Sequence, residues 1–225
     1  MILDNYKNII FDCDGVILNS NSIKTEAFVQ LAKPFGEANT LNLINYHRKN
    51  GGISRYKKFD YFVKNILGNK MGKKNDKEIQ ELIKRLCDRY SEIVFDSLVN
   101  AELAFGLKFL RQKLKYSDWL IVSGGDQDEL RKVFEKKSIA NYFNKGIYGS
   151  PESKYEIFKK CLFNKLIDKR SLFIGDSKLD YEVANHFGID FVFVSEWTEF
   201  EKLNEFAKSK GIKVFKKLIN ILEFN

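Results

Sequence analysis

The amino-acid sequence predicts an α/β protein with a doubly wound, mostly parallel sheet and an inserted all-helical segment. Short apolar runs have the length of buried strands, and helical patterns of about 10–14 residues separate the later runs. After the first run, by contrast, about 78 residues show helical patterns only. Strands that alternate with helices form an open parallel sheet with helices on both faces, so the long helical stretch is expected to be a separate unit.

Each strand is predicted from an apolar run that ends in polar or glycine-containing sequence. The four clear runs are residues 8–11, 119–122, 171–174 and 191–194, and a shorter, weaker run covers residues 146–148. The helices between them are expected at residues 101–114, 126–136, 151–163 and 178–187. Asp126 with Glu129 fits a capping box at the start of the second of these helices. Ser150 and Pro151 fit the N-cap and first position of the third, and Gly188 fits the end of the fourth.

Between residues 20 and 98 the sequence contains helical patterns without a strand. Pro34 and Gly36 end the first predicted helix, and Ser54 can cap a second that runs to about residue 68. Asn75 or Asp76 can cap a third that runs to about residue 94 and carries one apolar stripe. We expect a core domain of residues 1–19 and 99–225 and a helical cap domain of residues 20–98. The alternative is that these helices pack into one body with the sheet and have no lid function.

Composition and charge narrow the class of protein. The chain has 225 residues, of which 44% are hydrophobic, so it can bury a sizeable core. No apolar run approaches the roughly 18–20 residues of a membrane span, and the first residues do not resemble a signal peptide. Three dispersed cysteines indicate neither a disulfide framework nor a zinc site and fit a reduced, cytoplasmic protein. The net charge of +8 is spread over most predicted helices, which favours small anionic substrates over a nucleic acid as partner. No membrane partner is expected, and the oligomeric state is unknown.

Two aspartates follow the first predicted strand. Asp12 and Asp14 are two positions apart, so their side chains point the same way from an extended segment, and Gly15 lets the chain turn after them. Two converging carboxylates can hold a hard cation such as Mg²⁺ and can divide nucleophilic and acid–base work. The alternative is an acidic turn without a chemical role, since Asp and Gly both favour turns. The residues that follow the other strands decide between these interpretations.

Polar residues also follow three of the other predicted strands. Ligands of doubly wound sheets bind beyond the carboxyl ends of the strands, so these residues are expected to meet: Ser123, Gly124, Lys154, Asp176 and Asp180. The Ser123 hydroxyl and the unobstructed Gly124 amide suit a phosphoryl oxygen, although a simple glycine-rich turn is the alternative. Asp176 can add a Mg²⁺ ligand with Asp180 behind it, and helix-start preference alone also explains Asp180.

Lys154 lies in the first turn of a predicted helix, where the helix dipole disfavours a cation. A nearby cluster of carboxylates would compensate, and the ammonium could then neutralise a bound phosphate and hold Asp12 ionised. The alternative is a solvated surface lysine. Its place after the third strand along the chain favours the functional interpretation.

These motifs, in this order, resemble those of the haloacid dehalogenase superfamily of phosphotransferases. Its four signatures match DCDGV at residues 12–16, Ser123 at the end of WLIVS, Lys154, and GDSKLD at residues 175–180. The match spans nearly the whole chain and implies a Rossmann-like core with an inserted helical cap. Within the superfamily, the sequence is similar to the β-phosphoglucomutase and phosphoglycolate phosphatase subgroup.

The resemblance implies a role for each matched residue. Asp12 would be the nucleophile that becomes an aspartyl phosphate, and Asp14 would protonate the leaving oxygen and then deprotonate water. Mg²⁺ would be bound by Asp12, by the backbone carbonyl of Asp14 and by Asp176. Ser123 and Lys154 would hold the phosphoryl oxygens. An acid at position 14 favours phosphate esters over the dehalogenase and phosphonate branches, so the expected activity is a Mg²⁺-dependent phosphatase acting on a small phosphomonoester metabolite such as a phosphosugar.

Specificity is expected to lie in the helical segment. Arg55, in the sequence GISR, looks like the arginine with which β-phosphoglucomutase-like members contact a second anionic group of the substrate. His47 could also face the substrate, with a structural role as the alternative. Lys24 occupies the position where the mutases carry a histidine, and Leu86 the position of a mutase lysine. These departures leave a phosphosugar mutase as the alternative activity, and a catalytically idle binding protein as a further one.

Overall fold

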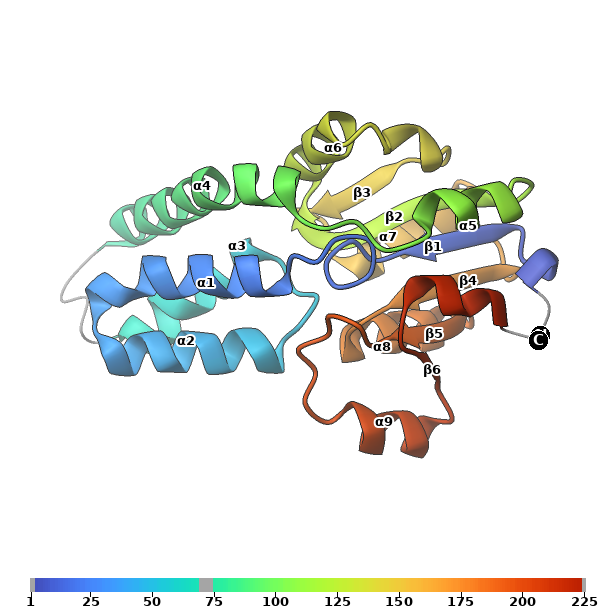
Figure 1. Ribbon diagram of the computed structural model, residues 1–225. Coiled ribbons are helices and arrows are strands. Elements are labelled where there is room, and N and C mark those ends of the chain that lie inside the picture. The colour runs from blue at the N-terminus through green and yellow to red at the C-terminus, as the bar shows by residue number, and fades with distance from the viewer. Residues whose placement is uncertain (1–2, 69–74, 224–225) are drawn as a thin grey trace.

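The computed structural model describes residues 3–68 and 75–223 of the chain. The described residues form one sheet of six parallel strands in the order β3-β2-β1-β4-β5-β6 (Figure 1). The strands are β1 (Asn8–Phe11), β2 (Asp118–Asp126), β3 (Ile147–Ser150), β4 (Ser171–Gly175), β5 (Asp190–Val194) and β6 (Lys213–Phe215). The order proceeds outwards from β1 in both directions, which confirms the expected doubly wound sheet. Its switch point, where ligands of such sheets bind, lies between β1 and β4.

The strand register aligns the carboxyl ends at this switch point. Phe11, the last residue of β1, pairs with Ile121 of β2 and Ile174 of β4. The polar residues that follow these pairs therefore lie at one edge of the sheet. All four residues of β1 and all five of β4 are buried, as expected for central strands of a sheet covered on both faces.

Helices cover the two faces of the sheet through separate apolar clusters. On one face, α7 (Lys154–Phe163) and α8 (Lys178–Phe187) pack on side chains such as Ile10 and Phe173. On the other, α5 (Leu107–Lys113), α6 (Gln127–Lys136) and the 3₁₀ segment Leu218–Glu223 pack on side chains such as Phe11 and Trp119. The helix α9 (Leu203–Lys210) packs on Phe193 of β5.

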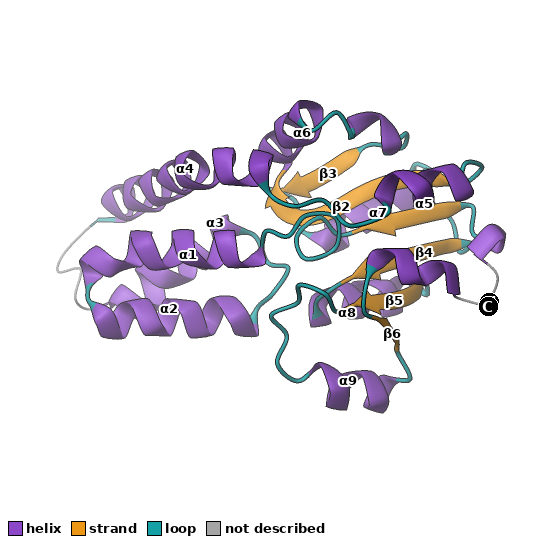
Figure 2. Cartoon of the chain, in the orientation of Figure 1, coloured by secondary structure: helices purple, strands orange, loops and turns teal. Residues whose placement is uncertain are grey.

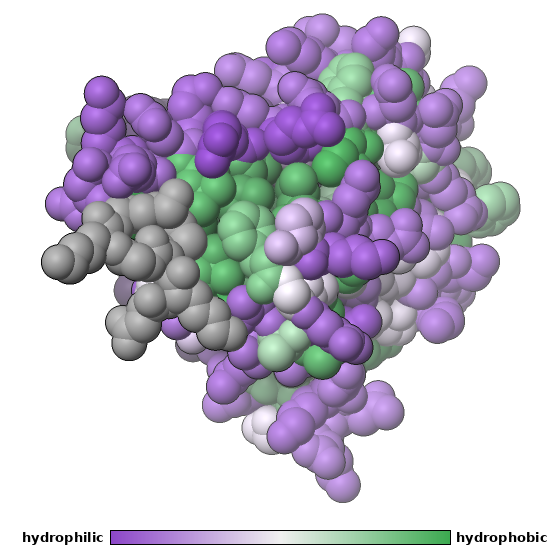
Figure 3. Space-filling model, turned by 90° about the vertical axis from the view of Figure 1, so that its left-hand side faces the viewer, coloured by the Kyte–Doolittle hydropathy of each residue, from purple (hydrophilic) through white to green (hydrophobic). Residues whose placement is uncertain are grey.

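The helical block, residues 20–98, lies beyond the carboxyl edge of the sheet (Figures 1 and 2). It contains α1 (Asn21–Ala32), α2 (Glu37–Lys49), α3 (Arg55–Tyr61) with its π-helical continuation Phe62–Leu67, and most of α4 (Asp76–Asn100). The Phe28 ring of α1 packs at a tilt against those of Phe59 of α3 and Tyr90 of α4, which joins three of these helices. Figure 3 shows the outer face of this block, which is hydrophilic around its margin and has an apolar area, coloured green, near its centre.

Several predicted helix ends are confirmed. Ser54 and Asn75 cap α3 and α4, and Gly188 ends α8 in the left-handed conformation. Asp126 caps α6 by accepting from the Glu129 amide, but the reciprocal half of the expected capping box is not among the recorded hydrogen bonds. The Glu129 carboxylate instead contacts another part of the chain, described below.

Other predicted boundaries are wrong. The helix α7 begins at Lys154, because Ser153 and Glu156 form its capping box, whereas Ser150 ends β3 and Pro151 follows outside the helix. The helix α5 begins at Leu107 instead of residue 101, after Gly106 in the left-handed conformation. The helix α4 continues to Asn100. The helix α2 and the short edge strand β6 were not predicted as separate elements. None of the helices in the described parts of the chain is long and apolar enough to cross a bilayer.

Candidate active site

Asp12 lies at the centre of the switch point and is buried. Its Oδ1 accepts a 2.7 Å hydrogen bond from the Cys13 amide, and its Oδ2 lies 2.7 Å from the Lys154 ammonium. Burial raises the pKa of Asp12 to about 7, the Lys154 ammonium opposes this rise, and the carboxylates of Asp180 and Asp14 add to it. The carboxylate is thus fixed in orientation and surrounded by more negative than positive charge.

Asp14 faces the same pocket from the turn after β1. Its Oδ2 accepts a 2.5 Å hydrogen bond from Lys24 Nζ of α1, and its Oδ1 accepts one of 2.6 Å from the Ser20 hydroxyl. Burial alone would raise the pKa of Asp14, but attraction by Lys24 and these two hydrogen bonds outweigh it and lower the pKa. Asp14 is therefore stabilised as a carboxylate.

Lys154 is buried between two carboxylates. Its ammonium lies 2.7 Å from Asp12 Oδ2 and donates a 2.5 Å hydrogen bond to Asp180 Oδ1. Burial disfavours the charged form, but attraction by Asp12 and Asp180 dominates and raises the pKa of Lys154. The expectation that a cluster of carboxylates compensates a cation in the first turn of this helix is met by the geometry, and the surface alternative is excluded because the side chain is buried.

Asp176 and Asp180 occupy different positions in the same cluster. Asp180 Oδ2 accepts from the Ser177 hydroxyl and amide, which caps α8, so both of its oxygens are engaged by the protein. Asp176 Oδ2 accepts a 2.8 Å hydrogen bond from Asn21, and its backbone carbonyl accepts one of 2.6 Å from Thr198. Burial, with Asp12 and Asp180 adding repulsion, raises the pKa of Asp176 well above its usual range.

This cluster fits a divalent cation. Candidate ligand oxygens of Asp12, Asp176 and Asp180 lie within 4.8 Å of one another, and all three residues are buried. In the described part of the chain, Asp12 and Asp180 both form ion pairs with the single ammonium of Lys154, and none is recorded for Asp176. Hard carboxylate oxygens with excess negative charge are the donor set that Mg²⁺ prefers. Of these three carboxylates, Asp12 and Asp176 line the cavity, whereas Asp180 is bound by Lys154 and Ser177 behind it, so Asp12 and Asp176 are the carboxylates that would hold the ion.

Ser123 and Gly124 lie within β2 at the same edge. The Ser123 hydroxyl is buried and accepts a 3.1 Å hydrogen bond from the Gly125 amide. A Cβ placed on Gly124 would come within 2.9 Å of the Gly52 carbonyl carbon, so the backbone of the helical block lies directly against this glycine. Gly124 therefore permits a contact between β2 and the turn before α3.

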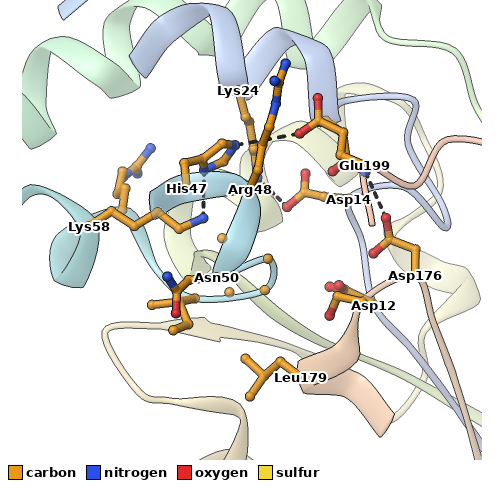
Figure 4. A pocket seen from close by; sticks show the side chains of 18 of the residues that line it. Asp12, Asp14, Lys24, His47, Arg48, Asn50, Lys58, Asp176, Leu179 and Glu199 are labelled. Carbon is orange, nitrogen blue, oxygen red and sulfur yellow. Dashed lines mark hydrogen bonds and ion pairs between the residues drawn. The ribbon is translucent and has the colours of Figure 1, made fainter. Parts of the chain in front are cut away.

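The structure places the three expected residues of the helical block around one cavity of about 290 Å³, together with Asp12 and Asp14 (Figure 4). Lys24 is paired with Asp14. Arg55 is buried and lies 2.8 Å from Glu129, so its guanidinium is already neutralised. His47 is buried between the Thr25 hydroxyl and the Lys58 ammonium, 3.0 and 2.8 Å away.

Several residues in or next to this pocket were not predicted from the sequence. Ser20 and Asn21 immediately follow the first strand and its acidic turn, a position that could have indicated their contacts with Asp14 and Asp176. Lys58 and Glu199 carry no motif, and only the packing of the helical block on the sheet brings them together. The presence of Lys58 and Glu199 in the pocket therefore depends on the tertiary structure and could not be predicted from a local sequence pattern.

The sheet order and the polar residues at its switch point fit a hydrolase of the haloacid dehalogenase type. The sequence profile of the family "Haloacid dehalogenase-like hydrolase" matches residues 9–194. The chain therefore belongs to this family. The family, the Rossmann-like α/β fold and the hydrolase class expected from the sequence are thereby confirmed.

Solved structures share the complete fold at low sequence identity. A protein described as a predicted phosphoglycolate phosphatase, from Haemophilus somnus, superposes with a TM-score of 0.72 at 20% identity over 98% of each chain. A β-phosphoglucomutase from Clostridium difficile gives a TM-score of 0.71 at 18% identity over 100% of this chain and 94% of that chain. A haloacid dehalogenase-like family protein from Streptococcus pneumoniae gives 0.68 at 20% identity over 98% and 99%. Comparison with curated proteins gave no match.

Proposed function

We propose that this protein is a Mg²⁺-dependent phosphatase that hydrolyses a small phosphomonoester metabolite through an aspartyl phosphate at Asp12. The observation that carries the proposal is the orientation of Asp12, whose buried carboxylate is held by Lys154 and the Cys13 amide at the edge of a cavity that Asp14 also lines. A carboxylate in this setting can act as a nucleophile without a separate base. Mg²⁺, when bound by Asp12 and Asp176, would supply charge neutralisation at the phosphoryl group.

The chain's own residues account for both halves of the reaction. An oxygen of Asp12 attacks phosphorus, the bond to the ester oxygen breaks, and the leaving oxygen takes a proton from Asp14. A water molecule then attacks the aspartyl phosphate and gives a proton to Asp14, which releases inorganic phosphate and restores Asp12. Lys24 and Ser20 favour the carboxylate form of Asp14, which is the form needed to deprotonate water. The proton that Asp14 takes from water in one turnover is the proton that it gives to the leaving oxygen in the next, and the first turnover requires Asp14 to take up a proton from solvent.

The phosphoryl oxygens would be held by donors at the same edge of the sheet as Asp12. The Lys154 ammonium, the Ser123 hydroxyl and the Gly124 amide are the donors that we assign to them. Phosphoryl transfer depends mainly on positioning and charge neutralisation, which such donors provide.

We propose that residues 20–98 act as a cap over a core domain of residues 1–19 and 99–225. Polar contacts join the two parts around the cavity: Lys24 with Asp14, Arg55 with Glu129, Tyr56 with Asp126 at 2.7 Å, and Thr25 with Glu199 at 2.9 Å. A cap held in this way would exclude bulk water while the ester bond is cleaved. Opening of the cap would require these contacts to break.

The alternative activity, a phosphosugar mutase, is less well supported. Lys24, which stands where the related mutases carry a histidine, contacts Asp14 directly.

A phosphatase in a reducing, cytoplasmic setting also agrees with the three free cysteines of the described chain, Cys13, Cys87 and Cys161.

The substitution Asp12→Asn tests the proposal. The purified protein should release inorganic phosphate from a generic phosphate ester in the presence of Mg²⁺, and Asp12→Asn should abolish this release. The matched control is Asp128→Asn, an exposed aspartate on α6, which should keep wild-type turnover. Hydrolysis that persists in the Asp12→Asn protein, or transfer of phosphate to another substrate molecule in place of water, would reject the proposed phosphatase.

A further inference from the structure

Three cations on the cap side of the cavity, Lys24, Arg55 and Lys58, are sheltered from solvent, whereas Arg48 and Lys49 of the same cavity are exposed. Lys58 differs from the other two sheltered cations. Lys24 is paired with Asp14, and the buried Arg55 is paired with Glu129. Lys58 is also buried and lines the same cavity, yet no ion pair is recorded for it with any carboxylate in the described residues. Its hydrogen-bond partner is the neutral ring of His47, at 2.8 Å from Nζ to Nδ1.

A chain of hydrogen bonds fixes the orientation of this ammonium. Because Lys58 donates to Nδ1 of His47, the other ring nitrogen, Nε2, carries the proton and donates to the Thr25 hydroxyl at 3.0 Å. Thr25 in turn donates to the Glu199 carboxylate. Burial and the positive charges of Lys58 and Lys24 lower the pKa of His47 to about 2, so the ring stays neutral. One of the three ammonium N–H groups of Lys58 is thus engaged, and two are left for a ligand.

A buried ammonium without a counter-ion is unfavourable, because burial removes its hydration. Burial and the nearby Lys24 accordingly lower the pKa of Lys58 to about 7, although the carboxylates of Asp14 and Glu199 oppose this at longer range. Both of these carboxylates already have closer partners, in Lys24 and Thr25. The missing counter-ion is therefore expected to come from the ligand that fills the cavity.

We propose that Lys58, oriented by His47, binds a second anionic group on the substrate and so selects phosphomonoesters whose alcohol part carries a carboxylate or a second phosphate. Figure 4 shows Lys58 and His47 on one side of the cavity and Asp12 and Asp176 on the other, so one substrate would contact both. Arg55, expected from the sequence to take this role, is neutralised by Glu129. The inference rests on the proposed phosphatase function.

Two pairs of esters test the proposal and separate the two anionic groups. The first pair is 2-phosphoglycolate and ethyl phosphate, and the second is ethane-1,2-diol bisphosphate and 2-hydroxyethyl phosphate. For the wild-type protein, kcat/KM should be about 10- to 100-fold higher for the ester that carries a second anionic group, 2-phosphoglycolate or the bisphosphate, than for the other member of its pair. A difference of this size is expected for a hydrogen bond to a charged group. Lys58→Met should abolish most of this preference in kcat/KM, and Lys58→Arg should retain part of it.

Lys57→Met is the matched control, because Lys57 is exposed on the same helix and its variant should keep the wild-type ratio. If Lys58→Met does not fold, as judged by circular dichroism, Lys58→Gln replaces it. An unchanged ratio in a folded Lys58 variant, or no preference by the wild-type protein in either pair, would overturn the assignment of Lys58. Absence of hydrolysis of all four esters would instead reject the phosphatase function itself.

Discussion

Arg55 of α3 and Glu129 of α6 form a buried ion pair, with 2.8 Å between Nη1 and Oε2. Both residues are less than 10% exposed, and the guanidinium also lies 5.2 Å from the centre of the Tyr90 ring. The pair joins the helical block to the sheet-bearing part of the chain. A cation that resembles a substrate-binding residue in sequence is therefore engaged in holding two parts of the molecule together.

Breaking this ion pair should destabilise the protein strongly. Arg55→Gln or Glu129→Gln would leave a buried charge without its partner, and each should lower the free energy of unfolding by about 3–5 kcal/mol. The double variant should lose less than the sum of the two, which urea unfolding of all four proteins measures. The exposed pair Lys84 and Asp88 on α4 serves as control and should show little coupling. If the loss in the free energy of unfolding of the double variant equalled the sum of the two single losses, the prediction would be contradicted.

The ammonium of Lys154 should be equally important for stability. Lys154→Met would leave the buried carboxylates of Asp12 and Asp180 without their shared cation, and we expect a loss of about 3–5 kcal/mol in the free energy of unfolding. Lys160→Met is the control, because its ion pair with Glu152 is exposed and should contribute about 0.5 kcal/mol or less. Denaturant unfolding without added metal compares the two, and equal losses would show that burial of the lysine does not matter.

The features predicted from the sequence are those encoded by local pattern. The strand β1 is a run of four buried residues, and its aspartates lie at the switch point because parallel strands end at one edge. The same reasoning predicts that Ser123, Lys154, Asp176 and Asp180 lie near Asp12. In the structure Lys154, Asp176 and Asp180 lie around Asp12, and Ser123 lies on the neighbouring strand β2.

The features that were not predicted arise from packing between distant segments. The contact of Arg55 with Glu129 and the chain from Lys58 to Glu199 join residues far apart in sequence, for which no motif exists. The strand β6 was missed because it is short, lies at the sheet edge and has an exposed Val214. The start of α7 was misplaced because the Ser150-Pro151 pair resembles a helix start as closely as the Ser153 capping box does.

Mg²⁺ should bind at Asp12 and Asp176 and stabilise the fold. At a concentration about a hundredfold above its Kd, the ion should raise the Tm by about 5–10 °C for a chain of this size. Asp176→Asn should reduce this shift, whereas Asp96→Asn, on the exposed surface of α4, should leave it unchanged. Thermal unfolding with and without Mg²⁺ measures the effect. An equal shift in the Asp176→Asn protein would place the ion elsewhere.

His47 should make the fold sensitive to acid. Its pKa is about 2 in the folded protein and 6.5 when unperturbed, so below pH 6.5 the unfolded chain binds a proton that the folded chain does not. This contribution to stability is complete above pH 6.5 and is lost as the pH falls, by about 2 kcal/mol at pH 5. Denaturant unfolding between pH 5 and 8 should show a flatter profile for His47→Asn than for the wild-type protein.

The second histidine of the chain provides the control for this measurement. His186 is exposed on α8, and His186→Asn should retain the acid-dependent loss of the wild-type protein. If His186→Asn flattened the profile and His47→Asn did not, the buried ring would not be the source of the effect.

Adding a methyl group at Gly124 should impair contact between the helical block and β2. A Cβ there would come within 2.9 Å of the Gly52 carbonyl carbon, and backbone cannot move aside as a flexible side chain can. Gly124→Ala should therefore lower kcat/KM for phosphate esters, and it should raise the rate at which protease cleaves the helical block. Gly51→Ala is the control, because its Cβ would meet Ser177 Cβ at an ordinary 3.5 Å. Equal behaviour of the two variants would show that the close approach of Gly52 to Gly124 is not needed for activity.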